Sequence, residues 1–142
     1  MRVNPARDHE DNGPRGVLIV EDDPTFSRVL RIFLDGEEEL YVVDNVGTAE
    51  EAFAHPLLDA VDLVLIDIGL PGVDGIEATK RLHEINPELH VIVMSGRGFE
   101  LVARQAVEAG AAAFLEKGAL HETLVHTLLS VGRRGRIVQH AA

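Results

Sequence analysis

Five short apolar runs, each followed by a longer amphipathic stretch, constrain the fold of this chain more than any other feature of its sequence. Consecutive aliphatic residues are typical of strands that are covered on both faces. Strands that alternate with helices form a parallel sheet with helices on both sides. We therefore predict an α/β fold with a five-stranded parallel sheet. The five runs occupy residues 16–20, 41–46, 62–68, 90–95 and 111–117.

Residues that start and stop helices mark the stretches between the runs. Pro24 opens the first helix, because proline is favoured in the first turn. Thr48 and Glu51 have the spacing of a capping box, which predicts the start of the second helix. We expect the third helix within residues 72–86, and Gly110 ends the fourth.

Charge and composition limit the partners and the location of the chain. Its 142 residues include 24 acids, 13 bases and no cysteine, and the net charge is −11. Such a surface repels phosphate backbones and anionic lipid, so we expect no direct binding to nucleic acid or to membranes. The lack of thiols fits a reducing, cytoplasmic location. We expect one domain at residues 16–132, between a flexible leader at 1–15, which is not a signal peptide, and a tail at 133–142.

Polar side chains follow four of the five predicted strands. Strand ends of a parallel sheet converge on one rim, where ligands bind. The second run ends in Asn45 and Gly47, which offer nothing comparable. The other four end in Glu21, Asp22 and Asp23, in Asp67, in Ser95 and in Lys117.

This set of groups suits the binding of a metal ion and of a phosphoryl group. Its ligands are oxygens alone, which suits a hard divalent ion such as Mg²⁺. Lys117 and Ser95 would suit a phosphoryl group, and a carboxylate can itself attack phosphorus. Taken singly each residue has a simpler explanation, and Asp23 before Pro24 could be only a helix N-terminal acid. Four groups that converge are harder to explain in that way.

Four motifs in this order resemble the receiver domain of two-component response regulators: "VLIVEDDP", "VLIDIGLPGVDG", "VIVMSG" and "AAAFLEKGA". The resemblance runs from about Gly16 to Val131. It implies the flavodoxin-like fold, a (βα)5 three-layer sandwich whose parallel five-stranded sheet has the order 2-1-3-4-5.

The resemblance also implies roles for the acidic residues. Asp67 matches the phosphoacceptor and is also a metal ligand. Asp22 matches the direct Mg²⁺ ligand of the acidic pair, and Glu21 its partner, which acts through water. The Gly69 backbone carbonyl matches a further metal ligand, and Asp23 is a third acid that could reach the site. Mn²⁺ could replace Mg²⁺.

The remaining motif positions match residues that sense the phosphoryl group. Ser95 matches the switch hydroxyl, Lys117 the lysine that pairs with the phosphate, and Phe114 the aromatic switch residue. Phe114 stands where tyrosine is commoner. Gly69 and Arg97 lie where water would attack the phosphoaspartate, so they could tune its lifetime.

The family chemistry implies partners and an output. A sensor histidine kinase or a histidine phosphotransfer protein donates the phosphoryl group, so the chain is a signalling domain that assists its own phosphorylation and dephosphorylation rather than an enzyme. The new charge changes the face formed by the fourth helix, the fifth strand and the fifth helix. That face would bind a downstream protein or effector domain, or a second copy of the chain.

Some alternatives remain open. Gly118 follows Lys117 where many receivers have proline, and "KGA" resembles receivers that precede LuxR-type DNA-binding domains. The chain could be a stand-alone receiver or part of a longer transcriptional regulator. A phosphorylation-independent pseudo-receiver that binds proteins is the main alternative. A haloacid-dehalogenase-type hydrolase lacks support because "DIGLP" has no second aspartate, and a dinucleotide-binding domain because no glycine-rich turn follows the first strand.

Overall fold

The computed structural model describes residues 13–96 and 99–131. Five parallel strands form one sheet in the order β2-β1-β3-β4-β5, which confirms the predicted α/β fold and its flavodoxin-like order. The strands are β1 (Arg15–Val20), β2 (Leu40–Val46), β3 (Leu63–Asp67), β4 (His90–Ser95) and β5 (Ala113–Glu116).

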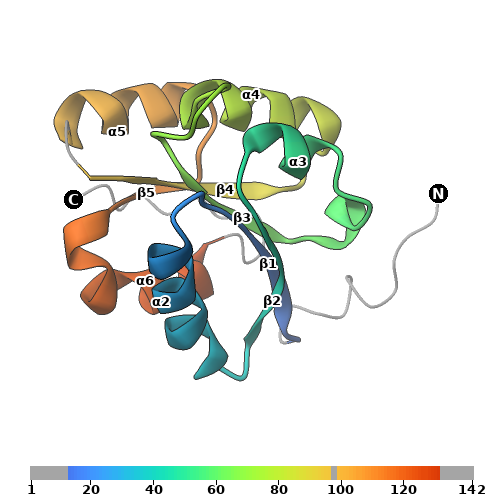
Figure 1. The fold of residues 1–142 in the computed structure, drawn as a ribbon, viewed down its shortest axis with the longest axis vertical. Coiled ribbons are helices and arrows are strands. Elements are labelled where there is room, and N and C mark those ends of the chain that lie inside the picture. The colour runs from blue at the N-terminus through green and yellow to red at the C-terminus, as the bar shows by residue number, and fades with distance from the viewer. Residues whose placement is uncertain (1–12, 97–98, 132–142) are drawn as a thin grey trace.

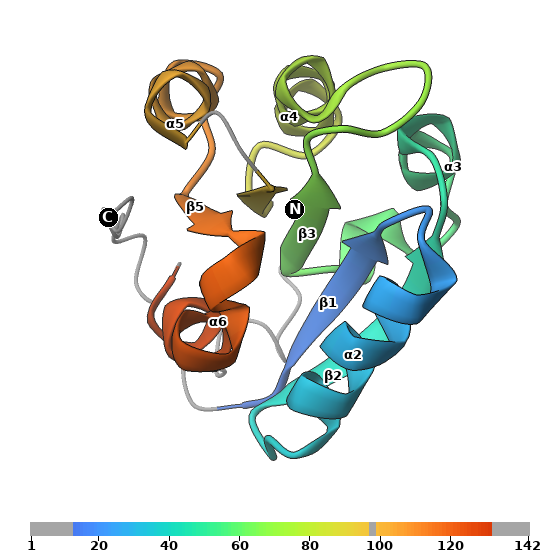
Figure 2. The same ribbon diagram turned by 60° about the vertical axis from the view of Figure 1, so that its left-hand side comes forward.

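Helices cover both faces of the sheet (Figures 1 and 2). α3, α4 and α5 lie on one side, and α2 and α6 lie on the other. Two 3₁₀ turns, Leu58–Ala60 and Lys117–Ala119, precede β3 and α6 respectively. The helices are α2 (Pro24–Asp35), α3 (Ala49–Phe53), α4 (Gly75–Ile85), α5 (Phe99–Glu108) and α6 (Leu120–Ser130).

The alternation of side chains along the strands divides the apolar core in two. On β1, Leu18 and Val20 belong to the cluster that α3, α4 and α5 cover. Val17 and Ile19 belong to the cluster that α2 and α6 cover. All four are fully buried, and burying an aliphatic side chain of this size stabilises the fold by roughly 1.5–3 kcal/mol. Both faces of the strand are therefore apolar, as the predicted two-sided sheet requires.

Most helix boundaries follow the local signals in the sequence. The Glu51 backbone N–H donates to Thr48 Oγ1 at 3.1 Å and the Glu51 side chain accepts from the Thr48 N–H at 3.2 Å, so the predicted capping box is present. α4 begins only at Gly75, because Asp74 Oδ1 caps it by accepting from two backbone N–H groups. β5 is shorter than the predicted strand at both ends: it begins at Ala113, and Lys117 already belongs to a 3₁₀ turn.

Hydrogen bonds connect the start of β1 to the end of α6. The Arg15 guanidinium donates to the carbonyls of Leu128, Leu129 and Val131, at 2.7 Å and 3.0 Å for the first two. These carbonyls lie at the end of α6, where no further turn of helix can satisfy them. Arg15 thus belongs to the folded unit, one residue before the predicted domain start. The rest of the predicted leader up to residue 12, and the whole tail, lie outside the described residues.

In the part of the chain that the structure describes, no helix is long and apolar enough to cross a membrane.

Candidate functional site

A lysine and two buried carboxylates meet where β1, β3 and β5 end. Glu21 follows β1, Asp67 is the last residue of β3, and Lys117 follows β5. Lys117 Nζ lies 3.1 Å from Glu21 Oε1 and 3.2 Å from Asp67 Oδ2. The sheet order therefore brings together three residues that the sequence separates widely.

Asp22 completes a group of three acids. One carboxylate oxygen each from Glu21, Asp22 and Asp67 lies within 4.8 Å of the others. Glu21 and Asp67 are buried, whereas Asp22 is exposed. Lys117 supplies one positive charge against these three carboxylates. An all-oxygen set with uncompensated negative charge and one exposed member fits a hard divalent ion such as Mg²⁺.

Glu21 is held in place but is not fully satisfied. Its Oε2 accepts a hydrogen bond from the Asp23 backbone N–H at 3.0 Å. Its Oε1 is buried and, among the described residues, has the ionic contact with Lys117 but no bond of good hydrogen-bond geometry. Burial raises the pKa of the Glu21 carboxyl, and the Asp67 charge adds to this, although Asp23 and Lys117 oppose it. A buried acceptor with spare capacity fits the predicted role of Glu21, which is to bind a metal-bound water.

Lys117 remains charged in this environment. Burial lowers the pKa of its ammonium, but the close contact with Glu21 and the charges of Asp67 and Glu21 outweigh that effect and raise the pKa overall. The ammonium also lies over the Phe26 ring, with Nζ 4.3 Å from the ring centroid. Helical periodicity in the sequence indicates that Phe26 belongs to the buried face of a helix, but periodicity cannot predict a contact with a distant lysine.

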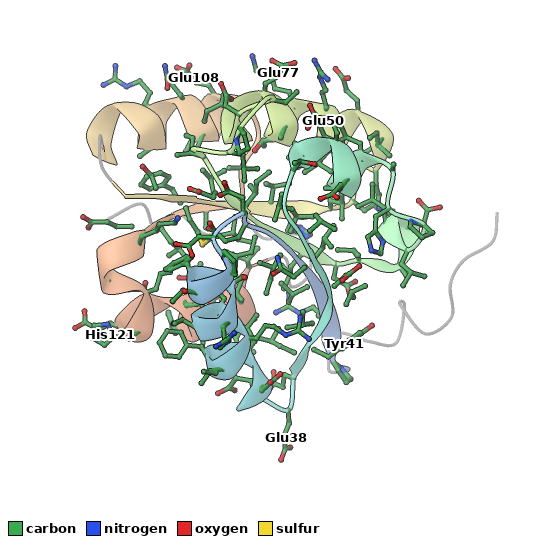
Figure 3. The ribbon with its side chains drawn as sticks, viewed as in Figure 1. Glu38, Tyr41, Glu50, Glu77, Glu108 and His121 are labelled. Atoms are coloured by element: carbon green, nitrogen blue, oxygen red, sulfur yellow. The ribbon has the colours of Figure 1, made fainter. Side chains whose placement is uncertain are left out.

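The charged cluster differs from the rest of the acidic surface. Figure 3 shows the side chains of Glu38, Glu77 and Glu108 pointing outward, away from the sheet and its helices. Such groups are solvated, so their charge is screened. The charges at the rim of the sheet are partly or wholly withdrawn from water and interact more strongly.

The loop after Asp67 contacts its carboxylate directly. The Gly69 backbone N–H donates to Asp67 Oδ1 at 3.3 Å, and Gly69 is exposed. Gly75 then packs tightly on the same loop: a Cβ there would lie 2.7 Å from Ile68 Cα and 2.9 Å from the Asp67 carbonyl oxygen. Gly75 thus permits the start of α4 to lie directly against the residue that follows β3.

Asp23 has a different role from the other two acids of "EDD". Its Oδ1 accepts from the backbone N–H groups of Thr25 at 2.9 Å and Phe26 at 3.4 Å. Asp23 is the N-cap of α2 and is not among the three clustered acids. This is the simpler explanation that its position before Pro24 allowed.

The two predicted switch residues share one face of the sheet. Ser95 ends β4 and is buried, and Phe114 on β5 is buried beneath α5 together with Ala106. Phe114 pairs with Val93, which points to the same side as Ser95 because side chains alternate along a strand. Arg97 lies outside the described residues.

An open groove of about 480 Å³ leads to the acids from the α2 side. Ser27 and Arg28 of α2 line one wall and Asn45 and Gly47 at the end of β2 line the other, with Asp22 at the base of α2. Glu21 and Asp22 also line the groove, so this part of the acidic cluster is accessible from outside.

Comparison with known proteins identifies the family. The family model described as "Response regulator receiver domain" matches residues 17–129. The transcriptional activator protein ExaE of Pseudomonas putida is 36% identical over 104 residues, which cover 73% of this chain and 49% of ExaE. The response regulator UvrY of Escherichia coli K12 is 30% identical over 115 residues, which cover 81% of this chain and 53% of UvrY.

Solved structures agree in fold. The signal receiver domain of the putative response regulator NarL from Mycobacterium tuberculosis superposes with a TM-score of 0.79 at 23% identity, over 87% of this chain and 99% of that one. A LuxR family DNA-binding response regulator from Silicibacter pomeroyi gives a TM-score of 0.67 at 32% identity, over 80% of this chain and 88% of that one. The chain spans about half the length of the curated relatives it matches.

Proposed function

Because this chain belongs to the response regulator receiver domain family, we propose that it accepts a phosphoryl group onto Asp67 from the phosphohistidine of a sensor histidine kinase or a histidine phosphotransfer protein. The observation that carries the proposal is the contact of Lys117 with both Glu21 and Asp67. This contact supports the proposal because a cation lies beside two buried carboxylates at the carboxyl ends of the strands.

The reaction requires a nucleophile and a nearby positive charge from this chain. The Asp67 carboxylate attacks phosphorus, the bond from phosphorus to the histidine nitrogen breaks, and the electron pair leaves with the imidazole. Lys117, 3.2 Å from Asp67 Oδ2, offsets negative charge that develops on the phosphoryl oxygens. Its raised pKa keeps the ammonium charged throughout the neutral range.

The acidic cluster would hold the Mg²⁺ ion. Asp22 and Asp67 would be direct ligands, Glu21 would bind through water, and the Gly69 carbonyl would be a further ligand from the protein. When bound, the ion neutralises charge on the acids and on the phosphoryl oxygens. Mn²⁺, which also prefers oxygen ligands, would substitute.

Phosphorylation then acts as a switch. A phosphoryl group on Asp67 adds negative charge at a buried strand end, and the Ser95 hydroxyl turns to donate to it. Phe114 moves into the space beside Ser95, and the face formed by α5, β5 and α6 changes shape. This face would bind a downstream protein, an effector domain or a second copy of the chain. A transcriptional output through a DNA-binding domain is proposed by analogy with the relatives described as transcription regulators.

A phosphorylation-independent pseudo-receiver is not favoured. A protein that acts without phosphorylation does not need the acceptor aspartate, the lysine or the acidic residues. Here all four residues are present: Lys117 contacts Glu21 and Asp67, and Asp22 lies within 4.8 Å of both acids.

Intact-protein mass spectrometry tests the proposal. Incubation with acetyl phosphate and Mg²⁺ should add one phosphoryl group to the wild type, and EDTA should prevent it. Asp67→Asn, which keeps the size of the side chain, should gain nothing. Absence of the adduct from the wild type, together with failure to bind beryllofluoride in a fluorine NMR titration, would leave the chain as a binding module.

A further inference from the structure

We propose that Phe26 is a positioning residue for the phosphotransfer reaction: its ring holds the Lys117 ammonium against Glu21 and Asp67. The inference rests on the proposed function of Asp67. It assigns a role to a residue of α2 that none of the four sequence motifs contains.

The geometry brings three kinds of partner to one ammonium group. Lys117 Nζ lies 3.1 Å from Glu21 Oε1, 3.2 Å from Asp67 Oδ2 and 4.3 Å from the centroid of the Phe26 ring. A cation at this distance over an aromatic face is attracted by the negative face of the ring. The ring also covers part of the ammonium, whose side chain is only 24% exposed.

The position of the ring is itself fixed by the site. Phe26 lies in the first turn of α2, which begins where Asp23 accepts from the Phe26 backbone N–H. The Asp23 backbone N–H in turn donates to Glu21 Oε2. Glu21, Asp23 and Phe26 are therefore linked by two hydrogen bonds, and the third acid of "EDD" acts by orienting the residue that covers Lys117.

The turn that begins at Lys117 is sparsely packed. Lys117 begins a 3₁₀ turn that has no side-chain cap, and a Cβ at Gly118 would meet nothing within 4 Å. Metal binding to the acids or phosphorylation of Asp67 would change the charges that face the ammonium. The ring is neutral in every state, so its own attraction for the ammonium does not depend on those charges.

The chain contains a matched control. Phe26 and Phe33 lie on the same helix, and both are partly buried against the same apolar cluster. The described contacts place only Phe26 over Lys117. Replacing either by leucine removes one ring from the same cluster, so a purely structural role predicts similar effects for both.

Rates of phosphorylation by acetyl phosphate test the proposal. We expect Phe26→Leu to slow phosphorylation about threefold to tenfold, Phe26→Tyr to restore it, and Phe33→Leu to leave it unchanged. In a Lys117→Met background, Phe26→Leu should cause no further loss, because two residues that act through one interaction are not additive. Equal slowing by Phe33→Leu, or a full additional effect of Phe26→Leu in the Lys117→Met background, would overturn the proposal.

An NMR measurement tests the contact independently of phosphorylation. The ε-methylene protons of Lys117 should resonate upfield in the wild type, because they lie over the ring. The shift should persist in Phe26→Tyr and in Asp67→Asn, and disappear in Phe26→Leu. If the wild type accepts no phosphoryl group but shows the shift, the proposed function fails while the contact stands. If the wild type is phosphorylated but the shift is missing, the role of Phe26 is overturned alone.

Discussion

At the scale of single residues, the site combines one cation with more negative charge than it can neutralise. The effect is seen at Glu21, which is buried and close to Asp67. Both its burial and the Asp67 charge raise the pKa of the Glu21 carboxyl. An acid whose pKa is raised in the folded state stabilises the fold fully only below its unfolded pKa. That stability is lost as the pH rises through the folded pKa.

Glu21→Gln should therefore stabilise the protein at neutral pH in EDTA. Glutamine keeps an acceptor for the Asp23 N–H and removes a buried charge. We expect a higher Tm than the wild type at pH 7.5, measured by circular dichroism, with the difference shrinking as the pH is lowered and the wild-type carboxyl becomes protonated. An unchanged or lower Tm at pH 7.5, or a difference that grows towards low pH, would contradict this account.

The sequence predicts the central residues of the site because strand order converts distant positions into neighbours. Glu21, Asp67 and Lys117 each lie at the carboxyl end of a strand, so a parallel sheet places them on the same rim, where they are in contact. The distinction between Asp22 and Asp23 could not be predicted in the same way. Both are acids after the same strand, and only the helix start at Pro24 decides which of them becomes a cap.

At the scale of elements, the approach of α4 to β3 positions the end of the acceptor strand. Gly75, the first residue of α4, lies against Ile68 Cα and the Asp67 carbonyl. Its backbone N–H also donates to the Ile68 carbonyl at 3.2 Å. A side chain at this position cannot be accommodated without movement of the helix or of the acceptor loop.

Gly75→Ala should destabilise the protein by about 1–3 kcal/mol, the usual cost of forcing extra volume into a packed contact. It should also slow phosphorylation of Asp67. Gly36→Ala is the matched control, because a Cβ there would meet only the Phe33 carbonyl at 3.8 Å, and its effect should be small. Urea unfolding of the three proteins provides the comparison, and equal stabilities for the two variants would refute the role of Gly75.

Element boundaries were predicted best where a local cap marks them. Thr48 and Glu51 mark the start of α3 with their own side chains. The start of α4 was harder to predict: the Asp74 cap places it at Gly75, and Gly72 has a φ of 78°, which no residue of an α-helix adopts. β5 ends early for a similar reason, since Lys117 enters a turn that no periodicity reveals.

At the scale of the whole molecule, the alternation of runs was sufficient to predict the sheet and its two covering layers, and the family resemblance supplied the strand order. Neither the alternation nor the resemblance predicts that the start of β1 contacts the end of α6. Arg15 contacts the carbonyls of Leu128 and Leu129, and a contact across that length of chain leaves no periodic signal in the sequence.

Arg15→Met should destabilise the whole domain by about 1–3 kcal/mol, because the carbonyls that end α6 lose a charged donor. Arg81→Met is the control: Arg81 forms a half-exposed pair with Glu77 at 3.3 Å, and pairs of this kind contribute at most about 1 kcal/mol. Urea unfolding measures both. Loss of stability no larger for Arg15→Met than for Arg81→Met would show that the connection between β1 and α6 is unimportant.

The most direct test of the account is to locate the phosphoryl group on the chain. Protein treated with acetyl phosphate and Mg²⁺ is reduced with borohydride, which converts an aspartyl phosphate to homoserine, and is then digested and sequenced by mass spectrometry. The account predicts homoserine at position 67 and an unmodified Asp22 and Asp23. A fully phosphorylated protein with homoserine at another position, or with none, would contradict it.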